Sequence, residues 1–90
     1  MDNMRLNAEL IEKIDKVIDE LSPIKLGINK KNELKRLMFE ICRRESRPLS
    51  DIERTVKAGL HKMEEKGEFF RRFKDLLVDL RYPSYRKGHN

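Results

Sequence analysis

Residues 26–44 read Leu-Gly-Ile-Asn-Lys-Lys-Asn-Glu-Leu-Lys-Arg-Leu-Met-Phe-Glu-Ile-Cys-Arg-Arg, and this stretch decides the fold. Its apolar residues recur at spacings of three and four, at Leu34, Leu37, Met38, Ile41 and Cys42. At about 100° per residue they cover one face about 140° wide, which predicts an amphipathic helix over about residues 30–45. The opposite face carries Asn32, Lys35, Arg36, Phe39 and Arg43. Phe39 therefore lies among cations, away from the apolar stripe, and we predict that it is exposed.

A helix is also predicted before this stretch, over residues 4–21, with Asn3 as its N-cap. Its apolar residues alternate by four and three along one face, at Leu6, Leu10, Ile14, Val17 and Leu21. Ser22-Pro23 ends that helix and suits a short new turn. Gly27 then permits a left-handed backbone, and Asn29 is a suitable cap for the helix that follows.

Two further apolar stretches follow a break at residues 46–49. Ser50 and Glu53 have the spacing of a capping box, which predicts a helix start. The buried stripe after it comprises Ile52, Val56, Gly59, Leu60 and Met63. Gly59 on that stripe would let another helix approach closely. The last stretch supplies the aromatic centre of the predicted core, with Phe69, Phe70, Phe73, Leu76, Leu77 and Leu80.

Gly67 leaves the organisation of the last two stretches open. It could separate two helices, or residues 50–81 could form one long, kinked helix. The second alternative arises because the three- and four-residue spacing of the apolar stripe continues through positions 63, 66 and 70, although position 66 is Lys. The predicted fold class is therefore all-α, a small three- to four-helix up-and-down bundle. We expect a single helical domain over residues 1–81. Tyr82-Pro83 ends the last helix, and a basic C-terminal tail occupies residues 82–90.

The composition limits the class of protein. Ninety residues make one domain with a thin core, and a second chain often completes such a core. The charged fraction is 41% and Gln is absent, which is typical of heat-adapted proteins. The single Cys42 excludes an internal disulfide and favours a reducing compartment. Without an apolar stretch long enough for a signal peptide or a membrane span, a cytoplasmic protein is expected.

Positive charge is concentrated in the middle of the chain. Residues 1–21 hold 3 basic and 6 acidic residues, whereas residues 22–48 hold 8 basic and 3 acidic residues. Such a patch attracts polyanions or an acidic protein surface. The predicted contact residues are Lys31, Asn32, Lys35, Arg36, Phe39, Arg43 and Arg47, assisted by Arg86 and Lys87 in the tail. The opposing interpretation is a solvated face that the acidic residues of the first helix neutralise.

The segment around Leu26-Gly27-Ile28 resembles the helix-turn-helix family of DNA-binding proteins, over about 20 residues. The resemblance implies a short helix, a glycine turn and a basic recognition helix. The chain departs from the pattern because the apolar residues after the turn are shifted by one position, which rotates the apolar face by about 100°. Binding of nucleic acid through shape and phosphate contacts makes no such demand on register.

Catalytic and metal-binding patterns are weak. Cys42 lies on the apolar stripe, where a free cysteine acts as a small hydrophobe. His61 is isolated, and no glycine-rich phosphate loop or metal-ligand spacing is present. The sequence therefore predicts a non-enzymatic interaction module or small adaptor subunit, without cofactor or metal. Its expected partner is a larger protein or a second copy in a homodimer, and not a membrane. The alternative is a nucleic-acid-binding protein that uses residues 30–45.

Overall fold

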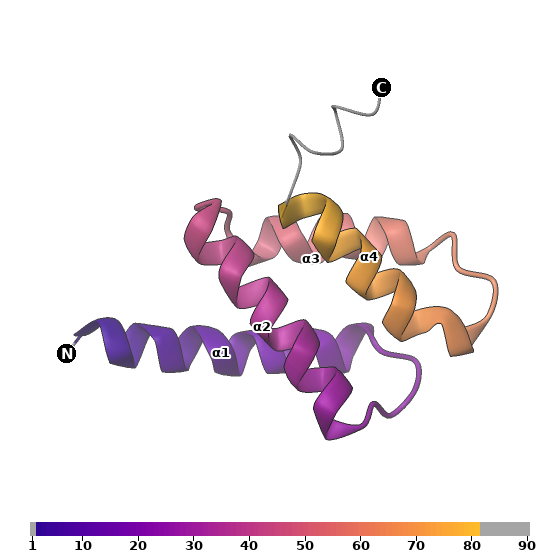
Figure 1. Cartoon of the computed structure of the whole chain (residues 1–90), viewed down its shortest axis with the longest axis horizontal. Helices are drawn as coiled ribbons and strands as arrows, with labels where there is room; N and C mark the ends of the chain where they lie inside the picture. The colour runs from indigo at the N-terminus through magenta and orange to yellow at the C-terminus, as the bar shows by residue number, and fades with distance from the viewer. Residues whose placement is uncertain (1, 82–90) are drawn as a thin grey trace.

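The computed structural model describes the backbone of residues 2–81 and the side chains of residues 7–81. This part of the chain forms four α-helices and one 3-10 turn, with no strand: α1 (Asp2–Leu21), α2 (Ile28–Arg44), α3 (Leu49–Leu60), η1 (Lys66–Glu68) and α4 (Phe69–Arg81). The predicted all-α bundle is confirmed (Figure 1). The proposed tail contacts Arg86 and Lys87 lie outside the described residues.

The helix α2 is the centre of the bundle. It packs against α1 on one side and against α4 on the other, and α4 in turn packs against α3. The spatial order is therefore α1, α2, α4, α3, and Figure 1 shows α2 and α4 lying across the other two helices. Because two neighbours flank α2, its residues Leu34, Met38 and Ile41 are fully buried, while residues near both ends of the helix remain exposed.

The core draws on every α-helix at the predicted spacings. Phe69 and Phe73 are fully buried, and their rings meet edge to face with centroids 5.4 Å apart, a favourable geometry for aromatic pairs. The half-buried Phe70 lies at the edge of this cluster. The buried residues are Ile14, Val17, Ile18, Leu34, Met38, Ile41, Ile52, Val56, Phe69, Phe73 and Leu77.

The last two apolar stretches form separate helices. The helix α3 ends at Leu60, and Gly67 lies inside the short turn η1. Residues 64–68 include no apolar side chain, so a continuous helix would have nothing to bury there. Folding α4 back onto α2 and α3 instead buries Phe69 and Phe73.

The predicted close approach at Gly59 is confirmed. A methyl group built on its Cα would lie 2.6 Å from both terminal methyl carbons of Leu76. Real Cβ atoms essentially never make contacts this short. Glycine therefore sets the distance between α3 and α4 at this point.

The predicted ends of α1 and α2 are partly wrong. The helix α1 begins at Asp2, so Asn3 lies within it and not at its N-cap. No helical turn forms between residues 22 and 27, where Ser22 instead accepts a hydrogen bond from the backbone of Ile24. Gly27 is the N-cap of α2, in an extended conformation with φ −66°, and Asn29 lies inside the helix.

The predicted capping box at Ser50 and Glu53 is also wrong. The helix α3 begins at Leu49 with Pro48 as its N-cap, and no side chain caps it. Ser46 adopts a left-handed conformation with φ 49°, which turns the chain between α2 and α3. The turn makes Pro48 the N-cap, two residues earlier than the Ser50 that the side-chain pattern indicated. None of the helices between residues 2 and 81 combines the length and the apolar character needed to cross a membrane.

Candidate interaction surface

Two of the predicted contact residues on α2 face the neighbouring helix α1. The Lys31 Nζ lies 3.1 Å from Asp15 Oδ1 and 2.7 Å from Asp19 Oδ1. The Lys35 Nζ lies 3.2 Å from the same Asp15 oxygen. We call these four residues the α1–α2 ladder. It neutralises part of the positive charge of α2, as one of the two interpretations of the sequence required.

Helical geometry explains the ladder. Asp15 and Asp19 are four residues apart on α1, and Lys31 and Lys35 are four residues apart on α2. Residues at this spacing share one face of a helix, so the two pairs meet when the helices pack side by side. The paired acids and the paired lysines were visible in the sequence, and only the packing partner was missing.

The ladder shifts the pKa values of Asp15 and Lys31. Hydrogen bonding to Lys31 is the largest cause that lowers the pKa of Asp15 below its ordinary 3.8, and Lys35 adds to it against a partial opposing effect of burial. Hydrogen bonds to Asp19 and Asp15 raise the pKa of Lys31. At neutral pH Asp15 and Lys31 are therefore held in their charged forms.

We expect Asp15→Asn to destabilise the protein at neutral pH but to have little effect in strong acid. A carboxyl whose pKa is lower in the folded chain stabilises the fold above its unfolded pKa and loses that contribution as pH falls through the folded value. The difference between the two proteins should thus shrink below pH 3.8. Because the Asp15 side chain is 34% exposed, we expect less than about a tenfold change in the folding equilibrium.

Urea unfolding of both proteins between neutral pH and strong acid would measure this difference. Asp75→Asn is the control, since Asp75 is exposed on α4 and the structure records no ion pair for it within residues 7–81. A destabilisation by Asp15→Asn that stays constant with pH would exclude the ladder as its source.

Other predicted contact residues on α2 face solvent. Asn32 and Arg36 are exposed and line a shallow hollow with Asn29 and Glu33. Glu33 also forms an ion pair with Lys74 of α4, with Nζ 2.6 Å from Oε1. Arg47 is half-buried in the connection between α2 and α3 and does not share this surface.

Phe39 is not the exposed aromatic that the sequence predicted. It is half-buried and packs against the edge of the core, because α4 and α1 cover α2 from both sides. The guanidinium carbon of Arg43 lies 5.7 Å from the centre of its ring, within the range of a cation–π interaction. Arg43 also donates a hydrogen bond from Nη1 to Asn7 Oδ1 at 3.4 Å. The ring thus supports Arg43 in an outward position.

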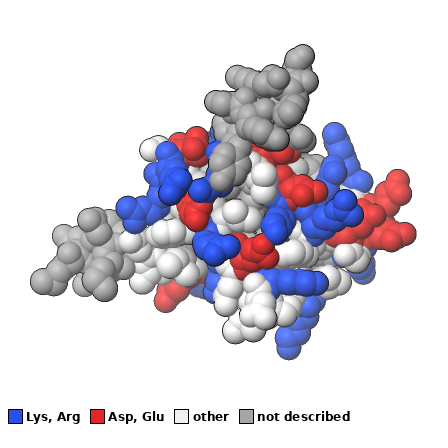
Figure 2. Space-filling model, in the orientation of Figure 1, with Lys and Arg blue, Asp and Glu red and all other residues white. Residues whose placement is uncertain are grey.

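Phe39, Glu40, Arg43 and Arg44 line a hollow of about 350 Å³, which we call the arginine hollow. Glu40 forms an ion pair with Arg81 of α4, so its negative charge is already compensated. Arg43 and Arg44 are exposed and form no ion pair with the side chains described from residue 7 to residue 81. The hollow is therefore positively charged, although Figure 2 shows both signs interspersed over the α2 and α4 face.

The groups that could carry chemistry are dispersed. Burial raises the pKa of the Cys42 thiol above its ordinary 9.0, which keeps it protonated near neutral pH. Among the described residues, no three His, Cys, Asp or Glu side chains lie close enough together to hold a metal ion. His61 is exposed at the end of α3, away from the arginine hollow.

Of the predicted contact residues, Phe39 and Arg43 come together in the arginine hollow, while Asn32 and Arg36 lie beside a neighbouring hollow on the same helix. Lys31 and Lys35 belong to the ladder. Arg44, which directly follows Arg43 in the sequence, also lines the arginine hollow. No family model, curated protein or solved structure matches this chain, so the surface must be interpreted from its own geometry.

Proposed function

We propose that the protein is a non-enzymatic binding module that holds an acidic surface of a partner protein against the arginine hollow. The observation that carries the proposal is the outward Arg43 guanidinium supported by the half-buried Phe39 ring. Arginine and aromatic residues are enriched among those that dominate the free energy of protein–protein binding. A partly buried ring beneath an arginine supplies both an apolar contact and a positioned donor.

The hollow favours carboxylates as the groups it binds. The planar guanidinium donates two parallel hydrogen bonds to a carboxylate, with defined direction. Arg43 and Arg44 provide two such groups side by side, and the pairing of Glu40 with Arg81 reduces the local repulsion of an incoming acid. Arg36 lies further along α2 and extends the positive surface.

We expect Arg43→Glu to weaken binding of the partner by at least about tenfold, as removal of a dominant interface residue does. The tagged full chain would be used to isolate partners from cells of its source, and each would then be purified and titrated by calorimetry. Arg71→Glu is the matched control, because Arg71 is exposed on α4, outside the hollow. Equal affinities of Arg43→Glu and the unchanged chain for every purified partner would refute the proposal.

A second copy of this chain is one partner that the hollow could bind. Light scattering of the full chain and of Phe39→Ala tests this directly. If the partner is a second copy, Phe39→Ala should lower the measured mass, because the ring that supports Arg43 is lost. A monomeric mass for the unchanged chain would exclude a second copy as the partner.

Nucleic acid is the second candidate partner, from a different class. The observation that favours it is the same cation–π contact of Arg43 with Phe39, since arginine and aromatic side chains both stack on bases. Gel-shift assays with mixed DNA and RNA at two salt concentrations distinguish the candidates. Phosphate contacts predict a steep loss of affinity with salt. Absence of any shift at low salt would eliminate nucleic acid.

A further inference from the structure

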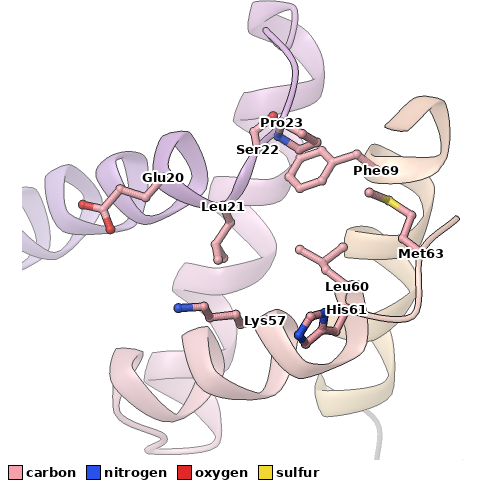
Figure 3. A pocket seen from close by; sticks show the side chains of 9 residues that line it. All are labelled: Glu20, Leu21, Ser22, Pro23, Lys57, Leu60, His61, Met63 and Phe69. Carbon is pink, nitrogen blue, oxygen red and sulfur yellow. The ribbon is translucent and has the colours of Figure 1, made fainter. Parts of the chain in front are cut away.

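A third hollow lies at the C-terminal end of α1, next to the end of α3 and the connection that leads to η1. Its volume is about 450 Å³, within the range of small-molecule sites. The apolar side chains that line it are Leu21, Pro23, Leu60, Met63 and Phe69. Figure 3 shows Leu21, Leu60, Met63 and Phe69 turned toward one another from separate parts of the chain. We call this site the apolar pocket.

The apolar pocket is open to a ligand from outside. Leu21, Leu60 and Met63 remain half-buried within the folded chain, whereas Phe69 at its base is fully buried. When an apolar ligand covers apolar side chains that are partly in contact with water, the free energy of the system falls.

Nitrogen groups lie along one edge of the apolar pocket. Lys57 and His61 are one turn apart on α3, both exposed, and both line it. Lys57 carries a positive charge on a long stem, and His61 offers ring nitrogens that donate or accept hydrogen bonds. Ser22 adds a hydroxyl. Glu20 is the one acid on the lining, and Figure 3 shows its carboxylate directed away from the apolar side chains.

We propose that the apolar pocket binds a medium-chain carboxylate, with its apolar tail against Leu21, Leu60 and Met63 and its carboxylate beside Lys57 and His61. The occupant is inferred from complementarity: an apolar floor with a cationic edge matches an apolar chain that ends in a negative charge. A tail without the carboxylate would leave Lys57 without a partner. A positively charged head group would meet Lys57 with repulsion.

This site is independent of the proposed partner-binding function. The apolar pocket contains the C-terminal end of α1, whereas Arg43 of the arginine hollow contacts Asn7 near the other end of the same helix. Figure 1 shows the corresponding ends of α1 at opposite sides of the bundle. Failure at one site therefore leaves the other untouched, and the two proposals are tested separately.

The experiment is a titration of the full chain with decanoate below its micelle concentration, followed by NMR. Signals of the Met63 methyl group and of the amides near Leu60 should shift with saturation. Acetate has the same head group without the tail, and decylammonium has the same tail with the opposite charge. We expect no saturable shifts with acetate and at least about tenfold weaker binding of decylammonium, the cost of losing one charged contact.

Lys57→Glu tests the cationic edge without disturbing the core, because Lys57 is exposed. We expect it to weaken decanoate binding by at least about tenfold. Lys62→Glu is the matched control, since it makes the same charge change on an exposed residue that does not line the pocket. The affinity of Lys62→Glu for decanoate should stay within about twofold of that of the unchanged chain.

Four outcomes would overturn the proposal. The first is the absence of saturable shifts with decanoate, and the second is equal binding of decanoate and decylammonium. The third is a loss of affinity that is the same in Lys57→Glu and Lys62→Glu, because a general effect of net charge would then explain the binding. Shifts that cluster away from Leu60 and Met63 would place the ligand elsewhere and count equally against it.

Discussion

Replacing Phe73 by Ala is expected to lower the free energy of unfolding by about 3–5 kcal/mol, the range measured for buried phenylalanines. Phe73 is fully buried, and its ring meets that of Phe69 edge to face. The substitution therefore leaves a cavity and removes an aromatic pair. A domain of this size is stable by only about 5–15 kcal/mol, so the loss takes a large share of the total. Urea unfolding followed by circular dichroism measures it.

Phe70→Ala is the matched control for this substitution. Phe70 is the same residue type on the same helix, but it is half-buried, with the Lys30 Nζ 5.4 Å and the Lys74 Nζ 6.0 Å from its ring centre. We expect Phe70→Ala to lower the free energy of unfolding by less than about half as much as Phe73→Ala, because a half-buried ring contributes less buried apolar surface. Equal losses for the two variants would mean that the core is not centred on Phe73.

Gly59→Val is expected to destabilise the protein by about 1–3 kcal/mol, the usual cost of overpacking. The valine Cβ would lie 2.6 Å from both terminal methyl carbons of Leu76, so α3 and α4 must separate or Leu76 must change its rotamer. Thermal or urea unfolding would measure the loss.

Gly67→Val is the control, because nothing lies within 4 Å of a Cβ at that position and its φ is not positive. It should be close to neutral. Combining Gly59→Val with Leu76→Ala should recover part of the stability lost by the two single changes, since the clashing atoms are removed. Contacting residues typically show such coupling, at about 0.5–3 kcal/mol. Strict additivity of the two changes would show that the helices do not meet at this glycine.

The apolar periodicity predicted the helices and their core faces. Leu34, Met38 and Ile41 were assigned to one stripe of α2, and all three are fully buried. This succeeds because the spacing of apolar residues is a local property of a helix, independent of what packs against it. The close approach at Gly59 was predictable for the same reason, since a glycine on a buried stripe removes the side chain that would keep a neighbouring helix away.

Helix boundaries were less predictable. Asn29 and Ser50 are good capping residues by type, yet both lie within helices, which Gly27 and Pro48 precede. The turn at Ser46 and the extended backbone at Gly27 depend on where the helices pack, and local side-chain preference does not determine this. The separation of α3 from α4 also depended on packing, because burial of Phe73 outweighs continuation of the helix.

The surface of α2 was predicted in part. Its basic residues were identified, but the angular position of Phe39 indicated exposure, and the structure half-buries it. A helix with one neighbour has one covered face, whereas α2 has neighbours on two sides. The spacing of apolar residues along a helix does not show whether one neighbour or two will cover it. The same fact divides the cations of α2 into Lys31 and Lys35, which form ion pairs with an acid of α1, and Arg43 and Arg44, which form none with the described side chains.

The α1–α2 ladder has a consequence for how this protein would respond to salt. A cation releases counterions from a polyanion only when it is free to contact a phosphate. Lys31 and Lys35 already contact Asp15, which is held at high effective concentration by the fold itself. A polyanion would have to displace this carboxylate before either lysine could contribute. When a polyanion binds, the number of counterions released should therefore be set by Arg43 and Arg44 at the other end of α2.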